Sequence, residues 1–148
     1  MREILFRGKC VDTGVWYEGG YIHLHKTTHC PIGDPDRFHD NDIHQIVFER
    51  MTDWELPNQH LRVDVNPETV GQFTGLTDKN GKKIFEGDIL KDDWGKIYKV
   101  FYTTKSCSFM VECTVTPNEW ETGNYRIGEA WRETIRVIGN IHDNQELL

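Results

Sequence analysis

The stretch from Val70 to Leu90, VGQFTGLTDKNGKKIFEGDIL, constrains the fold more tightly than any other part of the sequence. Asn80-Gly81 predicts a type I′ hairpin turn between two short strands, because both central residues of that turn need φ > 0. A second tight turn is expected at 86–88, where Gly87 takes φ > 0 and Asp88 accepts hydrogen bonds from backbone N–H groups. The glycine spacing fits neither G-x-G-x-x-G nor a P-loop, so the stretch predicts architecture rather than a phosphate site.

Period-two alternation of apolar and polar residues recurs along the chain, whereas no segment sustains the 3.6-residue period of an amphipathic helix. The sequence therefore predicts a mostly β fold with little helix. In the N-terminal half we expect a β-meander with turns at 12–14 and 18–20, and a long polar loop over 26–42. The predicted strands of this half are 3–9, 15–17, 21–25, 43–50 and 61–65.

Asn66-Pro67 marks the expected boundary between two domains, because Asn caps a helical turn and Pro suits its first position. We expect an N-terminal β-rich domain over 1–66 and a C-terminal domain over 67–148. After the central hairpin, strands 89–94 and 96–102 are expected to pair with each other.

The most regular predicted strand covers 106–115, where apolar and polar residues alternate. This alternation places Cys107 and Cys113 on a buried face as small hydrophobic residues. They lie too far apart along one strand for a mutual disulfide. A loop over 116–128 and a closing strand over 134–141 are expected to follow.

Several motifs occur in the same order as in a known family. They are ILFRG at 4–8, NPETVGQFTGL at 66–76, DKNG at 78–81, IFEGDI at 84–89 and VIGNIHDNQELL at 137–148. With these motifs the chain resembles the YopX-like phage and prophage proteins, and it departs from their usual ending at His142 and Gln145. The resemblance implies a small SH3-like β-barrel in the C-terminal half. It implies no activity and no functional residues.

The formal net charge of −7 is divided almost equally between the two halves of the chain. This balance argues against non-specific nucleic-acid binding, which needs a basic surface, and against a polybasic membrane contact. No apolar run reaches the ~18 residues of a membrane span, and the N-terminus lacks the apolar core of a secretory signal. We therefore expect a cytoplasmic protein whose cysteines are reduced.

The best metal candidate is the group formed by His23, His25, His29 and Cys30, with His39 and His44 nearby in sequence. Imidazole and thiolate are zinc ligands, and alternation places His23 and His25 on one strand face. The alternative, which we favour, is that these are solvated loop histidines, because no zinc-finger or protease spacing is present. The acidic run from Asp34 to Asp42 lacks the terminal glutamate of a calcium loop. We therefore predict no metal, cofactor or catalytic residue.

Exposed aromatic residues are the remaining candidates for a function. They are Trp54, Trp94, Trp120, Tyr125 and Trp131. Small barrels bind peptides through loop aromatics and sheet edges, so Trp94, Trp120 and Tyr125 are the candidates for a partner contact. The alternative, which we favour, is that these rings cap the core.

Three functions follow from these observations. The preferred hypothesis is a non-enzymatic phage or prophage accessory protein that acts through protein–protein contacts or self-association. The first alternative is a nucleic-acid-associated module, since small barrels bind single strands with aromatic and basic residues. The second alternative is a metal-dependent enzyme built on His23, His25 and Cys30. The basic residues that favour the first alternative are Lys79, Lys82, Lys83, Lys91, Lys96 and Lys99.

Overall fold

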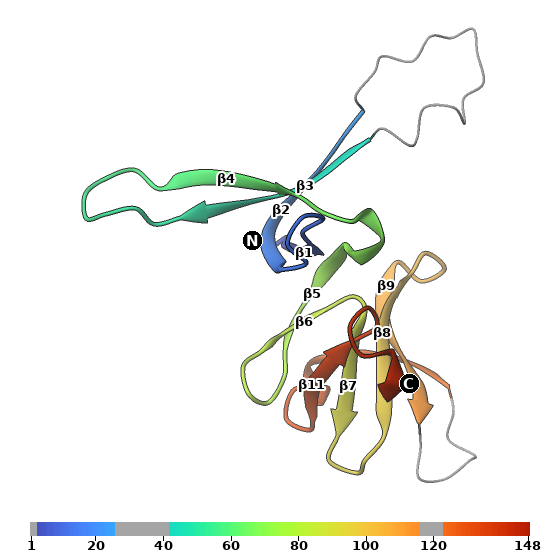
Figure 1. Ribbon diagram of the computed structural model, residues 1–148. Coiled ribbons are helices and arrows are strands. Elements are labelled where there is room, and N and C mark those ends of the chain that lie inside the picture. The colour runs from blue at the N-terminus through green and yellow to red at the C-terminus, as the bar shows by residue number, and fades with distance from the viewer. Residues whose placement is uncertain (1–2, 26–41, 116–122) are drawn as a thin grey trace, which may run out of the picture. The chain divides into compact units, whose positions relative to one another are not determined.

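The computed structural model describes residues 3–25, 42–115 and 123–148, and within them it contains two antiparallel β-sheets and no α-helix (Figure 1). The mostly β fold predicted from the alternation is therefore confirmed. The chain divides into two compact units: Leu5–Val70, called the N-terminal unit, and Met1–Ile4 with Gly71–Leu148, called the C-terminal unit. Within the described part, no helix is long and apolar enough to cross a membrane.

The N-terminal unit is built on four antiparallel strands in the spatial order β4-β3-β2-β1. They are β1 (Phe6–Lys9), β2 (Trp16–Leu24), β3 (Ile43–Arg50) and β4 (Gln59–Asp64). The unit ends in a single 3-10 turn, Pro67–Thr69, whose start is capped by Asn66: its side-chain Oδ1 accepts a hydrogen bond of 3.1 Å from the N–H of Glu68. The cap and turn predicted from Asn66-Pro67 are therefore confirmed.

The predicted turn at 18–20 is wrong, because β2 runs through these residues as one continuous strand. Gly19 does not turn the chain; it allows a close approach of the neighbouring strand. A Cβ atom built on Gly19 would lie 2.0 Å from the carbonyl oxygen of Val47, so only glycine fits there. The two glycines had been interpreted as turn residues, whereas one of them serves strand packing.

Few side chains are fully buried in the N-terminal unit. The buried hydrophobic residues described there are Cys10, Ile46 and Val65. Ring packing adds to this small core: the centroids of Tyr17 and Phe48 lie 5.1 Å apart. Two apolar side chains of β2, those of Ile22 and Leu24, remain exposed.

The C-terminal unit contains a hairpin and a five-stranded sheet. The hairpin pairs β5 (Gly71–Thr77) with β6 (Lys83–Phe85). The sheet has the order β10-β9-β8-β7-β11, and two 3-10 turns, Glu129–Trp131 and Gln145–Leu147, follow β10 and β11. Its strands are β7 (Asp88–Asp92), β8 (Ile97–Thr103), β9 (Ser108–Val115), β10 (Asn124–Arg126) and β11 (Ile135–Asn140). Among the described residues no strand pairing joins β10 to β11, so the closed SH3-like barrel stays a prediction.

The β5–β6 turn differs from the predicted type I′ geometry, because Gly81 has φ of +81° whereas Asn80 has no positive φ. Buried Asp78 explains the difference. Its Oδ1 accepts hydrogen bonds from the N–H groups of Asn80 at 2.8 Å and Lys82 at 2.9 Å. The side chain therefore replaces the second left-handed residue as the element that fixes the turn. The predicted positive φ at Gly87 is confirmed, at +80°.

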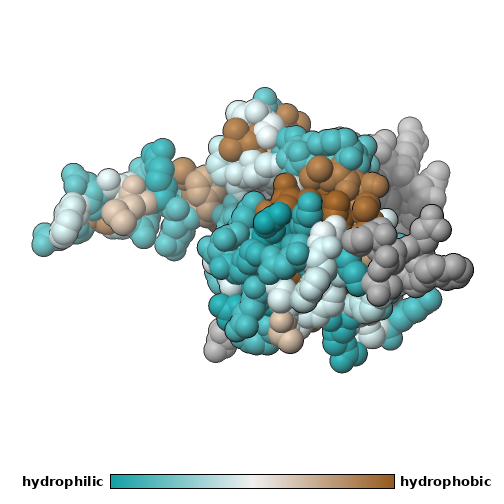
Figure 2. All heavy atoms as spheres, turned by 90° about the horizontal axis from the view of Figure 1, so that it is seen from below, coloured by the Kyte–Doolittle hydropathy of each residue, from teal (hydrophilic) through white to brown (hydrophobic). Residues whose placement is uncertain are grey.

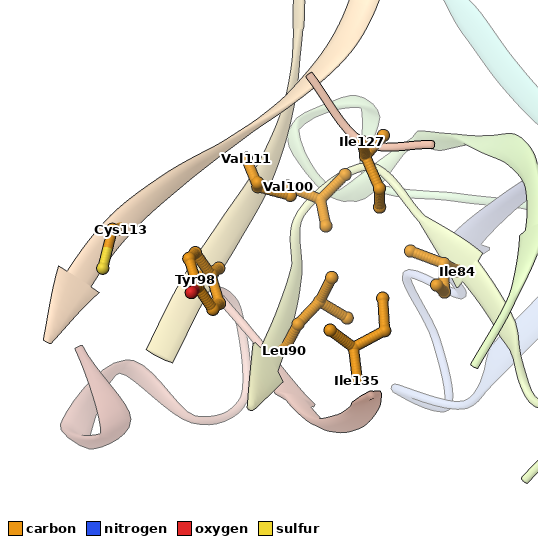
Figure 3. Close-up of a cluster of buried hydrophobic side chains, with 8 residues drawn as sticks. All are labelled: Ile84, Leu90, Tyr98, Val100, Val111, Cys113, Ile127 and Ile135. Carbon is orange, nitrogen blue, oxygen red and sulfur yellow. The ribbon is translucent and has the colours of Figure 1, made fainter. Parts of the chain in front are cut away.

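The hydrophobic core of the C-terminal unit gathers side chains from most of its strands (Figure 3). Its buried members are Ile84, Leu90, Tyr98, Val100, Val111, Cys113, Ile127 and Ile135. Cys113 is buried as predicted, whereas the prediction for Cys107 is wrong. Cys107 lies in the turn before β9 with φ of +48°, and this backbone takes its side chain out of the strand alternation.

Candidate functional site

The end of the β3–β4 hairpin extends beyond the strand pairing of β2. Pairing of β2 with β3 ends at Gly20 and Val47, whereas β3 and β4 remain paired as far as Arg50 and Gln59. Every residue from 49 to 60 is exposed, and we call this segment the hairpin arm. It is seen at the left of Figure 1, and Figure 2 shows both hydrophilic and apolar residues along its surface. The arm is held by backbone pairing rather than by burial in a core.

The turn of the hairpin arm is ordered by short-range hydrogen bonds. Asp53 accepts two of them. The backbone N–H of Trp54 donates to Asp53 Oδ1 at 2.7 Å, and the backbone N–H of Leu56 donates to the Asp53 carbonyl oxygen at 3.2 Å. The hydroxyl of Thr52 donates to the carbonyl oxygen of Pro57 at 3.1 Å. These bonds hold Trp54 in a position where 93% of the residue is exposed. Glu55 has φ of +67°, a conformation that non-glycine residues adopt rarely.

The residues predicted for a partner contact belong to the C-terminal unit, whereas the arm belongs to the N-terminal unit. Trp94 lies in the β7–β8 turn, where it is 68% exposed. Its backbone N–H donates to Asp92 Oδ1 at 2.9 Å. Tyr125 was placed in a loop, but it lies on β10, an edge strand, and is 41% exposed. Its ring centroid lies 6.3 Å from that of Trp131. Trp120 lies outside the described residues. Their joint role as a contact surface stays a prediction.

Trp54 was among the exposed aromatics in the sequence but was not selected as a contact. The signal that would have selected it is its setting in MTDWELPN, residues 51–58. Met51 and Leu56 add apolar side chains that are also exposed, and Asp53 and Glu55 flank the ring with negative charge. An exposed Trp with apolar neighbours in a turn that carries acidic residues is typical of an interaction site.

A second cluster lies where β2 ends and β3 begins. Asp42 directly precedes β3, and its carboxylate contacts His23 at the end of β2 and His25, which directly follows that strand. The distances are 2.8 Å from Oδ2 to His23 Nε2 and 3.0 Å from Oδ1 to His25 Nδ1. The sequence analysis placed both imidazoles on one strand face, and in the structure both contact the same carboxylate, that of Asp42, which the sequence analysis missed as their partner. The other members of the predicted metal group, His29 and Cys30, lie outside the described residues, as does His39.

The surroundings of the cluster lower the pKa of two of its groups, Asp42 and His44. The hydrogen bonds from His23 and His25 lower the pKa of Asp42, so this carboxyl is ionised at neutral pH. His44 lies opposite His23 in the strand register, and the two rings stack with centroids 4.5 Å apart. Burial and the neighbouring His23 lower the pKa of His44, whose Nδ1 lies 2.6 Å from the hydroxyl of Tyr21. One sheet face therefore combines an anion with several imidazoles.

A hollow in the C-terminal unit brings acidic and basic groups together without the arrangement of an active site. It is lined by Asp78, Lys79, Gly81, Glu129, Arg132 and Glu133. Arg132 pairs with Glu129 at 3.0 Å, and Lys79 pairs with Asp93. The Oδ2 of Asp78 accepts a hydrogen bond from the N–H of Val137 at 3.0 Å, so this carboxylate serves the fold.

Acidic partners also reduce the positive charge around the central hairpin. Beyond the Lys79 pair, Lys83 lies 3.6 Å from Glu3, and Lys99 lies 3.1 Å from Glu112. Three of the six lysines that favoured nucleic-acid binding therefore face a carboxylate. A phosphate backbone would have to compete with these carboxylates.

Comparison with known proteins gives one family and one solved structure of note. The family model described as YopX protein matches residues 5–148. The crystal structure of protein EF1440 from Enterococcus faecalis is similar over 100% of this chain and 99% of that chain, with 22% sequence identity and a TM-score of 0.49. No curated protein matches the sequence.

Proposed function

This chain belongs to the YopX protein family, and from that premise we propose that it is a non-enzymatic phage or prophage accessory protein that acts through protein–protein contacts. The single observation that carries the proposal is the hairpin arm, 12 consecutive exposed residues, 49–60, in which strand pairing at 49–50 and 59–60 supports the turn. A segment without core contacts contributes little to folding. Its strand pairing instead presents its turn to another molecule.

The partner we infer is a protein with an apolar pocket for Trp54 and basic residues at the rim of that pocket. The turn carries two carboxylates and no Lys or Arg over residues 51–58, which sets the sign of the complementary charge. The hydrogen bonds of Asp53 hold the turn before binding, so little conformational entropy is lost when Trp54 enters a pocket. Tryptophan in such a setting commonly supplies a large share of the binding energy.

The experiment compares Trp54→Ala with Trp94→Ala as a matched control, since both rings lie in exposed turns. A photo-crosslinking amino acid at position 54 identifies the partner in a lysate of the source cells, and the affinity of the purified partner is then measured. We expect Trp54→Ala to weaken binding by about 30-fold or more, which corresponds to the ~2 kcal/mol of a hot-spot residue. Trp94→Ala should leave the affinity for this partner nearly unchanged, and an equal loss would show that the partner also contacts the surface predicted around Trp94.

Equal affinities of Trp54→Ala and the unmodified protein for that partner would contradict this site. Sedimentation over a range of concentrations tests self-association separately, and an oligomer dispersed by Trp54→Ala would identify a second copy as the partner. A cytoplasmic location and an SH3-like barrel in the C-terminal unit remain parts of the proposal. Cell fractionation and an experimental structure of that unit test them.

A further inference from the structure

We propose that His23, His25 and Asp42 form a binding site for a divalent transition metal of the zinc type, with the ion joining the end of β2 to the start of β3. The three side chains offer two imidazole nitrogens and one carboxylate oxygen, all within 4.8 Å of one another. Two histidines and one carboxylate are a ligand set that Zn²⁺ accepts, with a fourth position open to water. Hard cations such as Ca²⁺ prefer an all-oxygen site.

The geometry is close to what a tetrahedral ion needs. Bonds of ~2.0–2.1 Å place neighbouring ligand atoms of a tetrahedral zinc site roughly 3.3 Å apart. The Asp42 oxygens lie 2.8 Å and 3.0 Å from the two ring nitrogens, slightly closer than this separation. The third separation, between the two ring nitrogens, is at most 4.8 Å. An ion that replaces the shared hydrogen atoms therefore requires side-chain shifts that bring all three separations to this value, and both histidines are exposed enough to make them.

The site is supported by its neighbours rather than formed by chance contact of flexible chains. The side chain of Asp42 is only 7% exposed, although it lies at the start of a strand, and each of its carboxylate oxygens contacts one of the two histidines. The stacked ring of His44 restrains His23 from the opposite strand, and Tyr21 contacts the Nδ1 of His44. Groups of this kind orient ligands in known metal sites.

Zinc would connect β2 and β3 next to the pair of Leu24 with Ile43, where the pairing of these two strands ends. The ion would therefore lie at the Ile43 end of β3, whereas the hairpin arm begins at the Arg50 end of the same strand. This proposal is independent of the arm contact, because the two sites share no residue.

The test is a titration of the purified full-length protein with Zn²⁺ against a chromophoric chelator. Three variants, His23→Ala, His25→Ala and Asp42→Asn, are compared with His60→Ala, an exposed histidine of β4 that lies 3.7 Å from Glu49 and serves as the matched control. We expect one equivalent of Zn²⁺ to bind the unmodified protein and His60→Ala. Loss of a direct ligand should weaken binding by more than the ~10–100-fold seen for supporting residues.

Spectra of the Co²⁺-substituted protein give a second measurement. A four-coordinate ion yields intense visible bands, and these should disappear in His25→Ala and Asp42→Asn. Circular dichroism checks that the variants fold, which we expect because none of the three replaced side chains is part of a hydrophobic core. Absence of binding, or binding unchanged in all three variants, would overturn the proposal. Preference for Ca²⁺ over Zn²⁺ would overturn it as well.

Discussion

The two units of this protein use β-strands in different ways. In the C-terminal unit the buried hydrophobic residues are Phe73, Ile84, Phe85, Ile89, Leu90, Tyr98, Val100, Val111, Cys113, Ile127 and Ile135. In the N-terminal unit the corresponding described residues are Cys10, Ile46 and Val65. The N-terminal unit instead extends β3 and β4 into an arm whose residues are all exposed. The strands within each unit pair in the same antiparallel way, so strand content alone does not show where the stability lies.

This difference separates the residues that hold the fold from those available for recognition. Burial of apolar side chains is the main favourable term in folding, and it is concentrated in the C-terminal unit. The N-terminal unit leaves exposed a tryptophan, a methionine and a histidine pair, which are groups suited to binding. The predictions below test this separation in order of decreasing effect on stability.

Leu90→Ala should have the largest effect, because Leu90 is fully buried in the C-terminal core. We expect the free energy of unfolding of that unit to fall by about 3–5 kcal/mol, the cost of lost burial plus a cavity. Leu24→Ala, at an exposed position of β2, is the control, with an expected loss below ~1 kcal/mol. Urea unfolding combined with amide hydrogen exchange assigns each loss to a unit. Similar losses for both variants would remove the distinction between the units.

Gly19→Ala should reduce stability through strain in the N-terminal unit. Its new Cβ would lie 2.0 Å from the Val47 carbonyl oxygen, so β2 and β3 must move apart, at a cost of about 1–3 kcal/mol. Gly20→Ala is the matched control, because the nearest atom to its Cβ, that same oxygen, lies 4.0 Å away. Chemical denaturation measures both variants. A larger loss of stability for Gly20→Ala than for Gly19→Ala would show that close packing of β2 against β3 is not the role of Gly19.

Asp78→Asn should lower stability by about 1–3 kcal/mol, because an amide NH₂ in place of Oδ2 can no longer accept the N–H of Val137. Burial by itself raises the pKa of Asp78, but hydrogen bonds from Val137, Lys82 and Asn80 outweigh burial and hold the pKa below its usual value. A lowered folded-state pKa stabilises the fold above the unfolded pKa, and this contribution is lost as pH falls through the folded pKa.

The difference between the unmodified protein and Asp78→Asn should therefore be full at neutral pH and shrink in acid. Denaturation curves at a series of pH values measure this difference. Exposed Asp93→Asn serves as the control, with an expected change within ~0.5 kcal/mol at every pH. A difference that stays constant down to strongly acidic pH would show that the charge of Asp78 is not what stabilises the turn.

Trp54→Ala should have the smallest effect on stability, within ~0.5 kcal/mol, because its side chain makes few contacts to lose. Trp131→Ala should cost more, since Trp131 packs against the C-terminal core and its ring lies 5.2 Å from that of Tyr98. Thermal unfolding followed by circular dichroism compares the two. A large loss for Trp54→Ala would mean that the arm supports folding rather than recognition.

The sequence predicted the strands best where apolar and polar residues alternate cleanly. Strand 43–50 was predicted with its observed bounds, Ile43–Arg50. The predicted turn at 18–20 failed because glycine serves both turns and close strand packing, and the partner strand decides which applies. The turn type at Asn80-Gly81 failed for a related reason, since the side chain of Asp78 supplies the constraint. Local patterns do not include such partners.

The candidate sites show the same limit. Alternation placed His23 and His25 on one face, but Asp42 was interpreted as part of an acidic loop, because its contact depends on the register of β2 with β3. The apolar and acidic neighbours of Trp54 were visible in the sequence, but the extent of its exposure was not, because exposure depends on how far each hairpin extends beyond its sheet. In both cases the residue types were visible and their positions in the sheet were not.

The position of β11 has a consequence for how the protein is made. β11 pairs with β7, and Ile135 enters the core from the end of the chain. During translation, residues 5–70 leave the ribosome first. β7 can pair with β8 soon after it emerges, but its other edge stays unpaired until residues 135–140 have emerged. A nascent chain therefore carries an open strand edge beside apolar side chains, and strand edges of this kind promote aggregation. We expect chains stalled before residue 135 to depend on chaperones more than the finished protein does.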